Sequence, residues 1–304
     1  MRILVTGVSG QVGSVLAKSL AAAGSVVPAD RNVLDLGDIS SISRRLDDLA
    51  PDVIVNPAAY TAVDRAEDEA ALAFRINGEA PGVVAQWAAR RSVPLLHFST
   101  DYVFDGSGQR PWRVDDITNP LSVYGQSKLA GERAVRAAGG PHLILRTSWI
   151  YHHTGLNFLR TIARLAAERT ELRIVADQIG APTSAASVAD TLAALIQTFD
   201  GNIPALVAAA DRTLHLACSG AASWHDFAVA VVTGLRARGY ALMVERVIPI
   251  KTSEHPTKAR RPQNSRLDLS RLEALLGGSM PPWQAALDTE LDRLVARHNR
   301  PGSP

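Results

Sequence analysis

The first half of the chain alternates short apolar segments with segments of helical periodicity, and this rhythm limits the folds that it can adopt. The apolar segments carry few polar residues, as expected of parallel strands that are buried on both faces of a sheet. We expect strands at 3–6, 25–29, 52–56, 94–99 and 142–146, and helices at 12–23, 40–49, 77–91 and 121–138. Repeated strand–helix units predict an α/β fold with a doubly wound parallel sheet.

The rhythm changes after residue 150. We expect helices at 157–167, 187–199 and 223–238, strands at 172–176, 213–217 and 244–248, and two closing helices. Residues 1–150 are predicted to form one domain, with further sheet elements, including a sixth strand, from 151–220. Most of 151–304 is predicted to form a smaller α/β lobe over the carboxyl edge of the sheet, where ligands of such sheets bind.

Three glycines, Gly7, Gly10 and Gly13, follow the first strand and open the first helix. Glycines at this junction allow a tight turn and let the free N–H groups of the helix terminus approach a pyrophosphate. A tight strand–helix connection without a ligand is the alternative, but the position at the start of an α/β pattern favours dinucleotide binding. The first domain is therefore predicted to be a Rossmann-like NAD(P)-binding domain, and the G-x-x-G-x-x-G spacing indicates the extended short-chain dehydrogenase branch.

The second strand ends in two residues that favour different cofactors. Asp30 can accept from the ribose 2′-hydroxyl of NADH, whereas Arg31 can pair with the 2′-phosphate of NADPH. We predict NADPH as the cofactor, with NADH also accepted. Asp35 and Leu36 either flank the adenine or belong to an ordinary polar loop.

Tyr124 and Lys128 stand four residues apart in an expected helix, so both side chains lie on one face. An ammonium beside a phenol is expected to lower the pKa of the tyrosine toward the working pH, where it can exchange a proton with a substrate oxygen. An ordinary surface pair is the alternative. Thr100 comes directly after the fourth strand, at the edge where a nicotinamide would lie, and its hydroxyl can bond the same oxygen. These three residues predict a catalytic group for carbonyl reduction.

Composition removes other classes of protein. With 304 residues, 32 basic and 30 acidic side chains and a net charge of +2, the chain lacks the basic excess of a nucleic-acid coat. Its one cysteine, Cys218, cannot form an internal disulfide, and we expect it to be buried and inert. Apolar runs such as 203–210 are far shorter than the roughly 18 residues of a membrane span. We expect a cytoplasmic protein with no nucleic-acid or membrane partner.

Several longer motifs carry a resemblance to a known family. They lie at 10–13, 52–64, 99–105, 120–132, 146–149, 177–183, 224–226 and 261–266. In these motifs, almost from end to end, the sequence resembles the dTDP-4-dehydrorhamnose reductases, a nucleotide-sugar branch of the extended short-chain dehydrogenases. The resemblance implies NAD(P)H-dependent reduction of the C4 ketone of dTDP-4-dehydro-L-rhamnose to dTDP-L-rhamnose, a step toward cell-surface polysaccharide.

The resemblance also implies residue roles. The cofactor would be held by Gly10, Gln11 and Val12 at the pyrophosphate, Asp30, Asp35 and Leu36 at the adenosine, Ala59, Tyr60 and Thr61 after the third strand, and Tyr124 and Lys128 at the nicotinamide ribose. The sugar nucleotide would be contacted by Val63, Thr100, Asp101 and Trp149. Tyr124 would be the proton donor.

The chain departs from the family in three places. Pro57 replaces a small residue after the third strand, which stiffens that loop. Some members bind Mg²⁺ between two subunits through glutamates, where this chain has Val15 and Ala186. We therefore expect no metal site and no Mg²⁺-bridged dimer, but a monomer or a weak homodimer.

Other residues allow two interpretations. Six basic side chains crowd one segment: Lys251, Lys258, Arg260, Arg261, Arg266 and Arg271. They form either a solvated loop or a clamp on the nucleotide diphosphate, and Arg261 is our candidate substrate ligand because it lies in a family motif. Trp224 and Trp283 can stack on thymine but are expected in the core, and His152–His153 is expected in a solvated loop.

Two other functions remain open. One is reduction or epimerisation at C4 of another nucleotide sugar. The other is a non-catalytic regulatory role, because the β subunit of methionine adenosyltransferase has a similar fold. The presence of Thr100, Tyr124 and Lys128 argues against the regulatory role.

Overall fold

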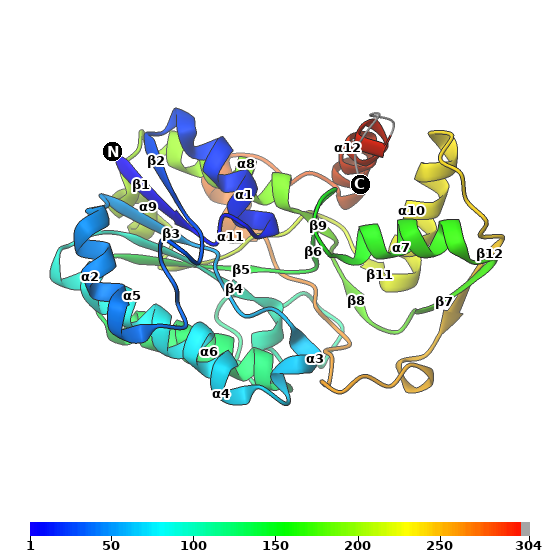
Figure 1. Ribbon diagram of the computed structural model, residues 1–304, viewed down its shortest axis with the longest axis horizontal. Coiled ribbons are helices and arrows are strands. Elements are labelled where there is room, and N and C mark those ends of the chain that lie inside the picture. The colour runs from blue at the N-terminus through cyan, green and yellow to red at the C-terminus, as the bar shows by residue number, and fades with distance from the viewer. Residues whose placement is uncertain (299–304) are drawn as a thin grey trace.

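The computed structural model describes residues 1–298 and centres on a six-stranded sheet (Figure 1). Its strand order is β10-β5-β4-β3-β1-β2, and every neighbouring pair is parallel. The strands are β1 (Arg2–Thr6), β2 (Ser25–Ala29), β3 (Val53–Asn56), β4 (Leu95–Thr100), β5 (His142–Thr147) and β10 (Thr213–His215). The predicted doubly wound parallel sheet is confirmed, including a sixth strand from the second half of the chain.

Helices cover both faces of this sheet because successive strand residues point to opposite sides. Ile3 and Val5 pack with α1 (Gln11–Ser19), α8 (Ala185–Thr198), α9 (Ile203–Ala209) and α11 (Ser270–Leu276). Leu4, between them in β1, packs instead with α2 (Ile39–Leu49), α5 (Ala80–Arg90) and α6 (Val123–Ala137). The two layers lie above and below the sheet in Figure 1.

The helix expected at 77–91 is confirmed, but its first residues belong to a π-helical turn, and two short helices precede it. The chain forms α3 (Val63–Ala66), α4 (Ala70–Phe74), a π-helical turn (Arg75–Glu79) and then α5. The Asn77 side chain in this turn accepts from the Tyr60 backbone N–H at 2.8 Å and donates to its carbonyl at 2.9 Å. A methyl group at Gly131 of α6 would overlap the Asn77 carbonyl oxygen. The π turn thus brings α6 close to the loop after β3.

The second lobe has its own core around Ile162, Phe227 and Leu291. It contains α7 (Phe158–Glu168), β7 (Glu171–Val175), α10 (Trp224–Ala237), β12 (Arg246–Ile250) and α12 (Trp283–His298). Two short pairs join it to the sheet: β6 (Ile150–Tyr151) with β9 (Thr183–Ser184), and β8 (Ile179–Gly180) with β11 (Ala222–Ser223). Three 3-10 turns complete the secondary structure, at Leu20–Ala22, Asp101–Val103 and Thr252–Glu254.

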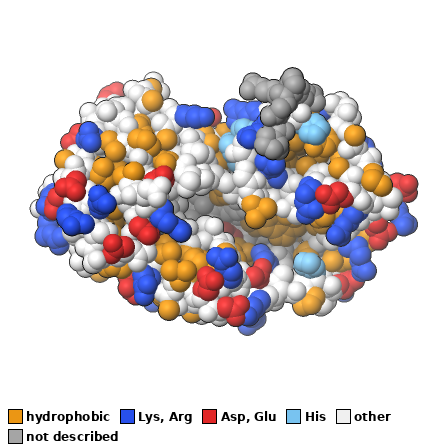
Figure 2. Space-filling model, in the orientation of Figure 1, with side chains coloured by type: hydrophobic (Ala, Val, Ile, Leu, Met, Phe, Trp, Pro, Cys, Tyr) orange, Lys and Arg blue, Asp and Glu red, His pale blue; other side chains and the backbone are white. Residues whose placement is uncertain are grey.

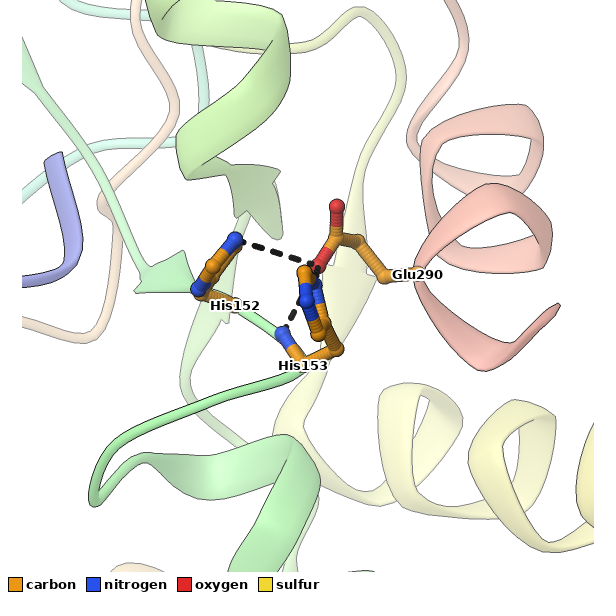
Figure 3. A group of neighbouring side chains, drawn as sticks. All are labelled: His152, His153 and Glu290. Carbon is orange, nitrogen blue, oxygen red and sulfur yellow. Dashed lines mark hydrogen bonds and ion pairs between the residues drawn. The ribbon is translucent and has the colours of Figure 1, made fainter. Parts of the chain in front are cut away.

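The expectation of a solvated loop at His152–His153 is wrong, because both side chains turn toward α12 (Figure 3). Glu290 of α12 is fully buried. Its Oε2 accepts from the backbone N–H of His153 at 2.7 Å and lies 2.8 Å from Nδ1 of the same residue, while its Oε1 accepts from Arg293 at 2.6 Å. This network ties the loop after β6 to the last helix.

Two smaller expectations concern Cys218 and the apolar runs. Cys218 is buried, and burial raises the pKa of its thiol, which makes it a poor nucleophile. Within residues 1–298 no single helix has the length and hydropathy of a membrane span. Helices α8 and α9 pass that test only when taken together, across a bend of 103°.

Candidate functional site

A cleft of about 690 Å³ lies between the carboxyl edge of the sheet and the second lobe. Figure 2 shows the molecule hollowed there. All the residues that the sequence singles out for cofactor, catalysis or substrate line this one cleft: Gly7, Gly10, Gln11, Val12, Gly13, Asp30, Arg31, Asp35, Leu36, Ala59, Tyr60, Thr61, Val63, Thr100, Asp101, Tyr124, Lys128, Trp149 and Arg261. The fold therefore collects residues from most of the chain in one place.

The glycine turn has the geometry of an anion cradle. Gly7 has a φ of +58°, and its carbonyl accepts from the Gly10 N–H at 2.9 Å. A methyl group at Gly13 would overlap the Gly7 carbonyl. The N-cap of α1, Gly10, provides no side-chain cap. The first N–H groups of α1 therefore remain available to a bound anion.

The loop after β2 holds two carboxylates in the same way, by hydrogen bonds from backbone N–H groups. Asp30 accepts from the backbone N–H groups of Asn32 and Val33, at 2.9 and 3.1 Å, so its carboxylate also shapes the turn. Asp35 does the same for the N–H of Gly37 at 2.8 Å. Arg31 is exposed beside them. Its guanidinium has room to meet a phosphate at the rim.

Thr100, Tyr124 and Lys128 meet at the centre of the cleft. Thr100 ends β4, and its hydroxyl donates to Asp101 at 3.1 Å, whereas Tyr124 and Lys128 lie one turn apart near the start of α6. Lys128 is almost fully buried and its Nζ donates to the Phe98 carbonyl at 2.7 Å. The strand end thus anchors both the threonine and the ammonium.

The expected lowering of the Tyr124 pKa is wrong. Burial raises the pKa of the phenol, and the nearby Thr100 hydroxyl offsets this only in part. The Lys128 ammonium donates its hydrogen bond to the Phe98 carbonyl, and burial lowers the pKa of this lysine to about 8. Tyr124 therefore keeps its proton at neutral pH, which is the state that a proton donor to an alkoxide requires.

A buried ion pair supports this helix from behind. Glu132 of α6 accepts from Nε and Nη2 of Arg146 on β5, both at 2.8 Å. Burial by itself would raise the pKa of Glu132, but the Arg146 guanidinium outweighs it and lowers this pKa to about 2. The two-point contact holds α6 against the sheet, one turn after Lys128.

Comparison with known proteins decides the family. The family model described as RmlD substrate binding domain matches residues 1–296. A dTDP-4-dehydrorhamnose reductase of Burkholderia thailandensis is 48% identical over 289 residues, covering 94% of this chain and 97% of that protein. The Escherichia coli K12 reductase is 40% identical over 298 residues, covering 97% and 98%. The chain belongs to the dTDP-4-dehydrorhamnose reductase family.

Solved structures of the family share the fold. The Clostridium acetobutylicum reductase superimposes with a TM-score of 0.87 at 35% identity, covering 97% of this chain and 100% of that one. The Bacillus anthracis reductase in complex with NADP gives 0.85 at 33%, covering 96% and 99%. A Thermus thermophilus UDP-glucose 4-epimerase reaches 0.75 at 19% identity, covering 97% and 99%, and shares the fold alone.

At the far end of the cleft lie aromatic residues whose importance sequence reasoning underestimated in this reductase. Trp224, expected in the core, lines the cleft and stacks on Trp149 with centroids 3.5 Å apart and planes at 7°. Phe158 lies 4.6 Å from Trp224. Tyr102, also missed, packs edge-on against Tyr124 at 5.5 Å. The motif at 224–226 contained the signal for Trp224, while Trp283 is buried as expected.

The basic segment does not act as one clamp. Arg271 pairs with Asp115 and Asp211 at 3.2 and 3.4 Å. Lys258 forms an ion pair with Asp68. Of the six basic residues, Arg261 lines the cleft, where its Nη2 donates to Asp64 at 2.6 Å. Arg261 therefore remains the candidate substrate ligand of this segment, and the Asp64 carboxylate of the sheet domain holds it in place.

Proposed function

We propose that this reductase-family member reduces the C4 ketone of dTDP-4-dehydro-L-rhamnose to give dTDP-L-rhamnose, with NADPH as the preferred hydride donor and NADH also accepted. The observation that carries the proposal is the meeting of Thr100, Tyr124 and Lys128 with the glycine turn in one cleft. The relatives named as dTDP-4-dehydrorhamnose reductases, at up to 48% identity, support the choice of substrate.

The cofactor fits the residues present, because the glycine turn leaves the first N–H groups of α1 without a side-chain cap and open to a pyrophosphate. The pyrophosphate would be held by Gly10, Gln11 and Val12, the adenosine by Asp30, Arg31, Asp35 and Leu36, and the nicotinamide ribose by Tyr124 and Lys128, with Ala59, Tyr60 and Thr61 along its length. The chemistry that NADPH supplies when bound is hydride transfer.

The chain itself supplies the proton and orients the ketone. Tyr124 donates a hydrogen bond to the carbonyl oxygen and gives up its proton as the alkoxide develops. The Thr100 hydroxyl donates to the same oxygen when it turns from Asp101. Lys128, whose ammonium donates to the Phe98 carbonyl, grips the nicotinamide ribose and sustains the proton transfer from Tyr124. Val63, Asp101, Trp149 and Arg261 contact the sugar nucleotide, and Arg261 meets the diphosphate.

We also propose a division of labour between the two parts of the chain. Residues 1–150, with sheet elements from 151–220, bind the cofactor, and most of 151–304 forms the lobe over the sugar nucleotide. Val63, Asp101 and Trp149 of the first part also contact the sugar nucleotide. Because Val15 and Ala186 cannot ligate Mg²⁺, the protein forms no metal-bridged dimer and is a monomer or a weak homodimer in the cytoplasm. Gel filtration with and without EDTA tests the metal dependence, and a dimer that the chelator dissociates contradicts it.

The test of the activity is NADPH consumption with a panel of dTDP-, GDP- and UDP-linked 4-ketosugars, repeated with NADH. We expect oxidation of NADPH only when a ketosugar is present, fastest with dTDP-4-dehydro-L-rhamnose. Faster reduction of a GDP- or UDP-linked sugar indicates a different nucleotide-sugar reductase. Absence of turnover with every sugar, together with co-purification with a partner enzyme, favours a regulatory subunit.

A further inference from the structure

The motif Asp177-Gln-Ile-Gly-Ala-Pro-Thr183 takes no part in the chemistry proposed above, and its own residues do not line the cleft. Its residues instead surround Trp149, the aromatic side chain proposed to contact the sugar. The arrangement of these residues around one indole suggests what the motif does.

The backbone of Trp149 is in an unusual conformation. Its φ is +48°, in the left-handed region that side chains as bulky as tryptophan rarely adopt. The Trp149 carbonyl accepts from the Thr183 N–H at 3.1 Å, and the next residue, Ile150, pairs with Thr183 in the β6–β9 ladder. Such conformations persist where the surrounding structure holds them, and they concentrate at ligand sites.

The indole of Trp149 is confined by two further residues. A methyl group at Gly180 would lie 2.5 Å from Cε2 and 2.7 Å from Nε1 of this indole. Trp224 stacks on it, at 3.5 Å. Gly180 and Trp224 come from neighbouring strand ends, because Gly180 pairs with Ala222 in the β8–β11 ladder.

Trp224 is itself oriented by the motif. Its Nε1 donates to Oε1 of Gln178 at 3.1 Å, and Nε2 of Gln178 donates to the Thr252 hydroxyl at 3.1 Å. That hydroxyl donates to Asp177 at 2.6 Å. The indole N–H of Trp224 and both polar atoms of the Gln178 amide are thus hydrogen-bonded, and Gln178 is almost completely buried.

We propose that Gln178, Gly180 and Trp224 are positioning residues that hold the Trp149 indole between them as a rigid wall whose edge contacts the hexose ring. This inference rests on the proposed function, since it assigns a sugar to that end of the cleft. A wall held in place before binding lowers the ordering cost when the sugar nucleotide enters. The motif therefore acts on sugar affinity and leaves the cofactor end unaffected.

The experiment compares steady-state kinetics of the full chain and four variants, with dTDP-4-dehydro-L-rhamnose and NADPH varied in turn. Gly180→Ala fills the space of the indole, and Trp224→Leu removes the stack. Trp224→Phe keeps an aromatic face, and Gly278→Ala is the matched control because a methyl group there meets open space. For the first two we expect the KM of the sugar nucleotide to rise about tenfold or more, with the KM of NADPH unchanged.

We expect Trp224→Phe to keep most of the sugar affinity that Trp224→Leu loses, which separates positioning from general destabilisation. NADPH binding and thermal unfolding of each variant check for destabilisation independently. If the wild type is active and Gly180→Ala and Trp224→Leu keep its sugar KM, the inference is overturned while the function stands. An equal rise in both KM values overturns it too, as does failure of Trp224→Phe to restore affinity. If the wild type reduces no ketosugar, the proposed function fails and the inference fails with it.

Discussion

The two ends of the cleft are built on different principles. At the proposed cofactor end, the glycine turn and the loops after β2 and β3 are consecutive connections of one parallel sheet, so their carboxyl-edge positions follow from chain order. At the sugar end, side chains come from distant segments, as in the contact of Arg261 with Asp64, 197 residues earlier. The first end depends on backbone N–H groups, and the second on aromatic faces and side-chain charges.

The difference predicts how each end responds to change. Backbone contacts at a glycine turn tolerate most side-chain variation nearby, provided that the glycines stay. An assembled aromatic wall depends on every residue that orients it. Substitutions at the shared centre are expected to affect chemistry, and substitutions at either end to affect one ligand alone.

The largest expected effect lies at the centre. Tyr124→Phe removes the proposed proton donor and should lower kcat by about 10²- to 10⁴-fold, the usual contribution of a general acid. Binding of NADPH, measured by fluorescence titration, should be nearly unchanged, because the ring remains. Wild-type kcat in this variant would exclude Tyr124 as the proton donor.

The next largest effect is expected at the buried ion pair of Glu132 and Arg146, which holds α6 against the sheet. Glu132→Gln leaves the buried Arg146 without its charged partner and should lower the free energy of unfolding by about 3–5 kcal/mol. Glu168→Gln is the matched control, because Glu168 pairs with Arg164 where both side chains are at least half exposed. Such a pair contributes about 0–1 kcal/mol. Equal losses in urea denaturation of the two variants would contradict the prediction.

The same ion pair predicts a pH dependence. The pKa of Glu132 falls from an ordinary 4.5 to about 2 in the folded state. Its stabilising contribution is therefore complete above pH 4.5 and is lost as the pH falls toward 2. Wild-type stability should fall more steeply than that of Glu132→Gln over this interval, and parallel curves from urea denaturation at each pH would contradict the assignment.

Arg31→Ala tests the cofactor end. If the guanidinium pairs with the 2′-phosphate, the KM of NADPH should rise about tenfold to a hundredfold, as for loss of a charged hydrogen bond, while that of NADH stays the same. The sugar KM, measured with saturating cofactor, should not move. A parallel loss with both cofactors would show that Arg31 acts on the loop and not on the phosphate.

The smallest effect is expected at the ion pair across the cleft. Asp64→Asn removes the carboxylate that holds Arg261, where the two side chains are 46% and 25% exposed. An exposed pair contributes about 0–1 kcal/mol, so kcat/KM for the sugar nucleotide should change by no more than about fivefold. Arg261→Ala, which removes the proposed diphosphate contact itself, should lower kcat/KM clearly more. An equal effect of both variants would place the role of Arg261 in the ion pair.

Much of the fold and of the candidate site could be predicted because the deciding patterns are local. Apolar strands alternating with helices predict the parallel sheet, and the i,i+4 spacing of Tyr124 and Lys128 places them on one face of α6. The carboxyl-edge rule then brings Thr100 and the glycine turn to the same cleft. The π turn at Arg75–Glu79 could not be predicted in this way, because it depends on how closely α6 approaches Asn77.

Chain order and residue spacing alone thus determine the sheet, the glycine turn and the group of Thr100, Tyr124 and Lys128. Burial and long-range contact decide the rest. The pKa of Tyr124 rises because the phenol is desolvated and Lys128 bonds a carbonyl instead. Likewise Trp224 faces the cleft and His153 faces Glu290. Electrostatic energy and packing depend on neighbours in space, and those neighbours are brought together only when the chain has folded.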